Sequence, residues 1–220
     1  MDFLNAMITF FQTGGAFMYP ILIVFAVGLA IAVERYIVLT RVRNKNRKVW
    51  DEVHPVIAEG KFDEAREMVS EDSATISQML NMGLARQGSV RRRDDIEIAM
   101  EESMMEITPQ LEKRTPYVAL FANISTLLGL LGTIMGLIAA FTAVANANPA
   151  EKADLLSASI SVAMNTTAFG LMAGIPLLIF HAVLTSKTTE IIDSLEMVSV
   201  KTLNVISEFA TRQSQTAKAA

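Results

Sequence analysis

The amino-acid sequence predicts an all-α membrane protein with three transmembrane helices and long cytoplasmic helical extensions. The chain has 220 residues, 51% of them hydrophobic, and a mean hydropathy of +0.37. Its charges are segregated, because residues 16–33, 115–150 and 155–186 contain no Asp, Glu, Lys or Arg. A spanning helix needs about 20 apolar residues, so each stretch can cross a bilayer once. The second and third stretches are long enough for their helices to continue into water.

The predicted elements follow one another along the chain. An N-terminal interfacial amphipathic helix over 1–15 ends at two glycines. The sequence begins Met1-Asp2-Phe3-Leu4, without the basic start of a signal peptide, so we expect the first spanning helix to be retained. The remaining segments are a span at 16–39, a cytoplasmic helical domain at 40–115, spans at 116–145 and 159–185 around a loop at 146–158, and a cytoplasmic helix and tail at 186–220.

Basic residues set the predicted orientation. They cluster at 41–48, 91–93 and 113–114, so the positive-inside rule places 40–115 in the cytoplasm and the loop at 146–158 outside. The N-terminus is then outside and the C-terminus inside. Apolar residues at helical spacing predict helices in the cytoplasmic domain and an amphipathic helix after the third span. The acidic run Glu97, Glu101, Glu102 and Glu106 is interpreted as a solvated face. The neighbours Glu34 and Arg35 are interpreted as an interfacial pair.

Composition excludes several classes of function. The net charge of −4 is modest and suggests no nucleic-acid partner. There is no cysteine, hence no disulfide and no thiolate metal site, and two histidines are too few for a histidine metal cluster. No nucleophile–base pair or phosphate-binding loop is present, so we expect the chain not to be an enzyme and to need no cofactor.

Small residues recur every three or four residues along the second and third predicted spans. GxxxG pairs at 132–136 and 170–174 let helices approach closely in lipid, either within one chain, in an oligomer, or against a partner. The predicted helix-packing and partner-docking residues are Gly129, Gly132, Gly136, Gly170, Gly174 and Pro176.

Hydroxyls lie among these glycines and predict an ion path. Thr133 is in the middle of one small-residue stripe and Thr167 is on the other, with Thr166 and Asn165 beside it. Hydroxyl oxygens can help to replace the hydration shell of a cation or hold a file of water. A proton relay normally needs a titratable group, yet neither long span contains Asp, Glu, Lys or Arg in its membrane core. If the chain conducts ions, a partner must supply the carboxylate.

The runs Gly129-Leu130-Leu131-Gly132-Thr133-Ile134-Met135-Gly136, Thr167-Ala168-Phe169-Gly170-Leu171 and Ile175-Pro176 resemble the MotA/TolQ/ExbB family, most closely its ExbB and TolQ type. The predicted layout is similar too. The resemblance implies a homopentamer in the bacterial inner membrane around a single-span ExbD/TolR-like partner, which carries an intramembrane aspartate. It also implies an ion-driven rotary motor that energises TonB-dependent transport or another envelope process, with a TonB- or TolA-like protein as a further partner. Thr133 and Thr167 match the family's pore threonines.

One position departs from the family's pattern. ExbB and TolQ commonly have a glutamate five residues before the second pore threonine, where this chain has Val162. The hydroxyls of Thr133, Thr166 and Thr167 resemble those of sodium-driven stators, so transient Na⁺ binding is favoured over H⁺ as a hypothesis. A non-conducting three-span scaffold is the alternative function.

Overall fold

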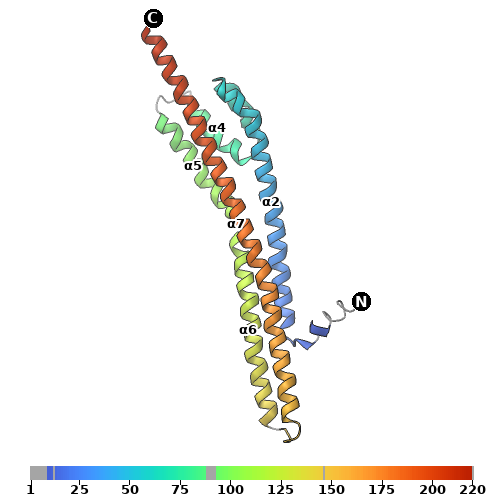
Figure 1. The fold of residues 1–220 in the computed structure, drawn as a ribbon. Helices are drawn as coiled ribbons and strands as arrows, with labels where there is room; N and C mark the ends of the chain where they lie inside the picture. The colour runs from blue at the N-terminus through green and yellow to red at the C-terminus, as the bar shows by residue number, and fades with distance from the viewer. Residues whose placement is uncertain (1–8, 12, 88–92, 146, 220) are drawn as a thin grey trace. The chain divides into compact units, whose positions relative to one another are not determined.

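The computed structural model describes residues 9–11, 13–87, 93–145 and 147–219, and the regular elements in these ranges are α-helices (Figure 1). Three helical segments are long and apolar enough to cross a membrane: Met18–Ala58, Arg93–Ala145 and Lys152–Arg212. The predicted fold class of three spans with long helical extensions is therefore confirmed. Most of the interfacial helix predicted over 1–15 lies outside the described residues. Contacts divide the chain into two units, which are described separately.

The apolar unit comprises Met1–Arg35 and Arg114–Leu184. It contains the first part of α2 (Met18–Ala58), all of α6 (Thr115–Ala145) and the first part of α7 (Lys152–Ala219). Small and apolar side chains form its buried interior, among them Ile21, Ala32, Val118, Ala122, Ala163 and Leu177. Large apolar side chains also point outward, and Ile23, Phe141 and Ile179 are each at least 60% exposed. An outward apolar surface of this extent fits contact with lipid.

The start of α6 is fixed by a backbone conformation and an ion pair within the apolar unit. Arg114 precedes α6 and has φ = 67°, in the left-handed region that non-glycine residues rarely adopt. Its Nη1 donates to both carboxylate oxygens of Glu34, at 2.7 and 2.9 Å. Glu34 therefore has an ion-pair partner in the turn before α6, in addition to its sequence neighbour Arg35, with which it also interacts electrostatically. Pro116 follows in the first turn of α6, where its missing N–H costs nothing.

The charged unit comprises Tyr36–Lys113 and Thr185–Ala220. It contains the rest of α2 and α7 together with α3 (Phe62–Ser70), α4 (Thr75–Gln87) and α5 (Arg93–Glu112). The apolar positions that predicted these helices are buried in its core, including Val53, Ile57, Ile96, Met100, Ile107, Leu111, Ile191 and Leu195. The helices predicted for residues 40–115 and for the tail are therefore confirmed.

A glycine ends α2. Gly60 has φ = +79°, its N–H donates to the Ile57 carbonyl at 2.9 Å, and the N–H of Lys61 donates to the Val56 carbonyl at 3.2 Å. These are the two hydrogen bonds of a Schellman cap, in which glycine tolerates the left-handed conformation without a Cβ clash. The cap turns the chain into α3.

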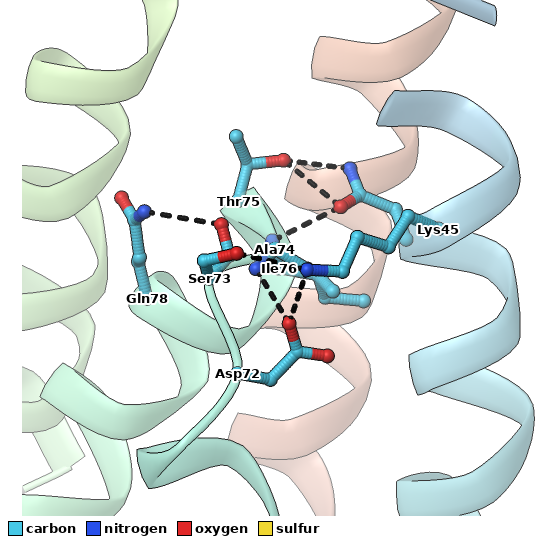
Figure 2. A network of polar contacts seen from close by, with 8 residues as sticks. Lys45, Asp72, Ser73, Ala74, Thr75, Ile76 and Gln78 are labelled. Atoms are coloured by element: carbon cyan, nitrogen blue, oxygen red, sulfur yellow. Dashed lines mark hydrogen bonds and ion pairs between the residues drawn. The ribbon is translucent and has the colours of Figure 1, made fainter. Parts of the chain in front are cut away.

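A polar network joins α2 to the start of α4 (Figure 2). Asn46 is 4% exposed, and its amide hydrogen-bonds the Thr75 hydroxyl at 2.7 Å and accepts from the Ile76 N–H at 3.3 Å. Lys45 forms an ion pair with Asp72 at 2.5 Å, and the hydrogen bond from this lysine holds the pKa of the Asp72 carboxyl below its usual range. The Asn46 side chain satisfies a backbone donor in the first turn of α4, so the network both caps α4 and fixes it to α2.

Candidate functional site

The small residues of α6 and α7 face one another within a single chain. A Cβ added at Gly170 would lie 2.8 Å from Gly129 Cα and 2.8 Å from the Ser125 carbonyl oxygen. A Cβ added at Gly136 would lie 2.9 Å from the Cβ of Ala163. Separations this short leave no room for a side chain on Gly170, so glycine is what allows the two backbones to approach closely here.

Gly132 and Gly174 also lie at the contact between α6 and α7. A Cβ at Gly132 would clash with the Thr166 side chain, and one at Gly174 would lie 3.0 Å from the Ala122 carbonyl oxygen. Pro176 lies inside α7, where its ring removes one helical hydrogen bond. The structure thus accounts for the glycines by packing within the chain. Docking of a partner on the same faces stays a prediction.

Close approach brings the two predicted pore threonines together. The hydroxyls of Thr133 on α6 and Thr167 on α7 hydrogen-bond one another. The Thr167 hydroxyl also donates to the Gly129 carbonyl at 3.0 Å, and the Thr133 hydroxyl lies 3.4 Å from the Ala163 carbonyl. Both threonines are half-buried. Two hydroxyls and two carbonyls converge at this point, a set of neutral oxygens that can hold water or a cation.

Thr166 and Asn165, the other two predicted ion-path residues, bond to the segment before α2. Thr166 is 2% exposed, and its hydroxyl donates to the Gly14 carbonyl at 2.6 Å, while the Asn165 amide donates to the Thr13 hydroxyl at 3.3 Å. The structure therefore ties both residues to the segment before α2, and it does not bring them to the Thr133–Thr167 pair.

Aromatic rings strengthen this attachment of the N-terminal segment. Phe11 packs edge-to-face on Phe169 of α7, with ring centroids 5.7 Å apart, and on Tyr19 of α2 at 5.3 Å. Sequence reasoning missed this role because an aromatic ring near a chain end has no spacing that reveals its partner. The one available signal was the amphipathic pattern of the segment itself.

The oxygen cluster has no charged neighbour from its own spans. Residues 115–150 and 155–186 contain no Asp, Glu, Lys or Arg, and position 162, five residues before Thr167, is a valine. The Val162 side chain would lie 3.1 Å from a Cβ at Gly15, so it packs toward the N-terminal segment. Among the described residues, no group of three or more His, Cys, Asp or Glu side chains could hold a metal ion.

The fold and this cluster define a multi-pass helical membrane protein with neutral polar groups at the contact between two of its spans. Residues 71–197 match the MotA/TolQ/ExbB proton channel family, and the chain belongs to that family. It is 24% identical over 204 residues to an ExbB homolog of Methanothermobacter thermautotrophicus, described as a biopolymer transport protein, an alignment that covers 92% of this chain and 71% of the relative. It is 37% identical over 78 residues to the Tol-Pal system protein TolQ of Haemophilus influenzae, covering 36% of this chain and 34% of TolQ. The family is a channel family, not an enzyme family.

Proposed function

We propose that this chain is the ion-conducting subunit of a rotary motor of the ExbB/TolQ type, driven by an ion-motive force across the inner membrane. In this proposal five copies surround an ExbD/TolR-like single-span partner, with N-termini periplasmic and C-termini cytoplasmic. The motor energises TonB-dependent transport or another envelope process through a TonB- or TolA-like protein. Family membership and the names of the two relatives support this assignment.

The observation that carries the proposal is the Thr133–Thr167 pair. The two hydroxyls hydrogen-bond one another, and that of Thr167 donates to the Gly129 carbonyl, at a contact where glycines leave the helix backbones without side chains between them. Threonine hydroxyls in packed membrane helices bond either to their own helix or across to a neighbour. Here both threonines lie in the part of the chain that matches a proton channel family, and their oxygens converge at one point, which supports an ion path. The cluster lacks a group that changes charge. The intramembrane aspartate of the partner would supply that group, and the ion would pass between it and the hydroxyls.

Sodium is the proposed ion. Na⁺ needs several neutral oxygens in place of its water, and the cluster offers hydroxyl and carbonyl oxygens while Val162 offers no carboxylate. Because the Thr166 hydroxyl is bonded to Gly14, it can join the ion only if that hydrogen bond opens. The sodium proposal therefore rests chiefly on Thr133, Thr167 and the carbonyls they contact.

Flux measurements in membrane vesicles test the function and the ion together. We expect vesicles that contain this chain and the single-span partner to take up Na⁺ down its gradient, and uptake to disappear when the partner is omitted. Full motor activity in sodium-free medium under a proton gradient would refute sodium while leaving the motor intact. Stable assembly with the partner but no flux of either ion, in any gradient, would favour the scaffold.

A further inference from the structure

Lys187 of α7 packs against α2 near the start of the charged unit. Its Nζ donates to the Thr40 hydroxyl at 2.6 Å and lies 4.1 Å from the centroid of the Tyr36 ring. Further along the two helices, Arg43 of α2 forms an ion pair with Glu190 of α7 at 2.6 Å. These two contacts, about one turn apart, hold α2 and α7 side by side here, so the fold fixes the position of the lysine's ammonium group.

The partners of the Lys187 ammonium group leave its positive charge in place. A hydroxyl oxygen and an aromatic face attract a cation, but neither carries a formal negative charge. Among the described residues, no carboxylate lies within ion-pairing distance of Lys187, and Glu190, one turn away, is already paired with Arg43. An ammonium group has three N–H donors, so Lys187 can donate to an anion while it keeps its bond to Thr40.

Arg41 is a second cation without an acidic partner, and it follows Thr40 directly in α2. It is exposed, and within the described parts of the chain it has no carboxylate at ion-pairing distance. The other four basic residues of the cluster at 41–48 do have such partners, in the pairs Arg43–Glu190, Lys45–Asp72, Arg47–Asp51 and Lys48–Glu52. Because Arg41 is next to the residue that Lys187 bonds, its long side chain can reach an anion held by that lysine.

Exposed apolar side chains come shortly before these cations on α2. Tyr36, Ile37 and Val38 are 44%, 43% and 36% exposed. Ile37 precedes Arg41 by four residues, so the two side chains are neighbours on one face of the helix. A helix face that changes from apolar to cationic within one turn is typical of a helix that leaves the bilayer, where aromatic rings also gather. A ligand that fits both parts of this face has an anionic head and an apolar chain.

We propose that Lys187 and Arg41 bind the phosphate of an anionic phospholipid whose acyl chains lie along Ile37 and Tyr36. Lys187 supplies an ammonium group that the fold holds in place, and Arg41 supplies a planar pair of donors that suits phosphate. Two cations favour a lipid with a net negative charge over a zwitterionic one, whose own ammonium group has the same sign as theirs. A free phosphate ion could satisfy the same donors, but it would leave Ile37 uncovered. This lipid site is separate from the proposed ion path and does not depend on which ion passes.

Native mass spectrometry of the purified 220-residue chain in detergent, titrated with single lipids, tests the site without the diffuse potential of a charged membrane. We expect phosphatidylglycerol to bind about 10- to 30-fold more tightly than phosphatidylcholine. Lys187→Gln and Arg41→Gln should each weaken phosphatidylglycerol binding about fivefold and leave phosphatidylcholine binding unchanged. Lys187→Arg keeps the charge, so it should retain most of the preference. Arg41 is exposed, so its variant remains informative if Lys187→Gln disturbs the contact between α2 and α7.

Lys48→Gln is the matched control, because it removes the same charge from the same basic cluster. Lys48 is exposed and pairs with Glu52 at 3.9 Å, so its loss should change phosphatidylglycerol binding by less than about twofold. An equal loss in Lys48→Gln and Arg41→Gln would show diffuse attraction and overturn the site. Equal binding of the two lipids to the unmodified chain would also overturn it. Displacement of phosphatidylglycerol by an equal concentration of inorganic phosphate would assign the donors to a free anion and refute the lipid.

Discussion

Replacing Gly170 with alanine is expected to force α6 away from α7 and to destabilise the apolar unit by about 3 kcal/mol or more. The added Cβ would lie 2.8 Å from Gly129 Cα and 2.8 Å from the Ser125 carbonyl oxygen. Both are backbone atoms, which cannot rotate away as a side chain can. Gly170→Leu should prevent the helix pair from forming. Unfolding of the purified chain in detergent, followed by circular dichroism against denaturant, measures the loss.

Gly83→Ala is the matched control, because Gly83 is also a helical glycine with close neighbours. Its added Cβ would meet only the flexible side chain of Met100, which can move. Alanine gains about 1 kcal/mol of helix propensity over glycine, so we expect a net change within about 1 kcal/mol. Equal stability of Gly170→Ala and the unmodified chain would contradict the close backbone contact.

Replacing Thr133 and Thr167 together by valine should lower ion flux about 10- to 100-fold while the fold is kept. Valine has nearly the shape of threonine, and removing both partners of a hydrogen bond is close to neutral for stability. The ion, in contrast, loses oxygens whose contacts to a charged group are worth about 1.5–3 kcal/mol. Flux into liposomes that contain the complex with the single-span partner measures the effect.

Two other valine variants separate the roles of the hydroxyls. Thr126→Val removes a hydroxyl that donates to the Ala122 carbonyl of its own helix, and flux should remain. Thr166→Val removes the bond to Gly14, so it should loosen the N-terminal segment, detected as faster proteolysis there. Flux unchanged in the Thr133/Thr167 double variant would show that the ion takes another path.

Much of the fold could be predicted because hydropathy and periodicity are local signals. Uncharged runs predicted the three spans, and buried positions such as Val53, Ile57 and Met100 were identified by their spacing. The proximity of Thr133 and Thr167 could be expected too, because both lie among small residues on faces that can approach closely.

The spacing of residues along a helix cannot predict which other segment packs against each face of that helix. Thr166 and Thr167 are adjacent in sequence and about 100° apart around a helix, so only one of them can face α6 squarely. The Thr166 methyl group packs against Gly132 of α6, but its hydroxyl donates to the Gly14 carbonyl, a contact between residues 152 positions apart that no local pattern records. The ion pair between Glu34 and Arg114 is another case, because the sequence separates these two residues by 80 positions.

The most direct test of the proposed ion path is flux through liposomes of three compositions: this chain alone, the chain with its single-span partner, and the chain with a partner whose intramembrane aspartate is replaced by asparagine. The account predicts flux only in the second, because the Thr133–Thr167 oxygens lack a group of their own that changes charge. Flux from the chain alone, or equal flux with the asparagine partner, would contradict it.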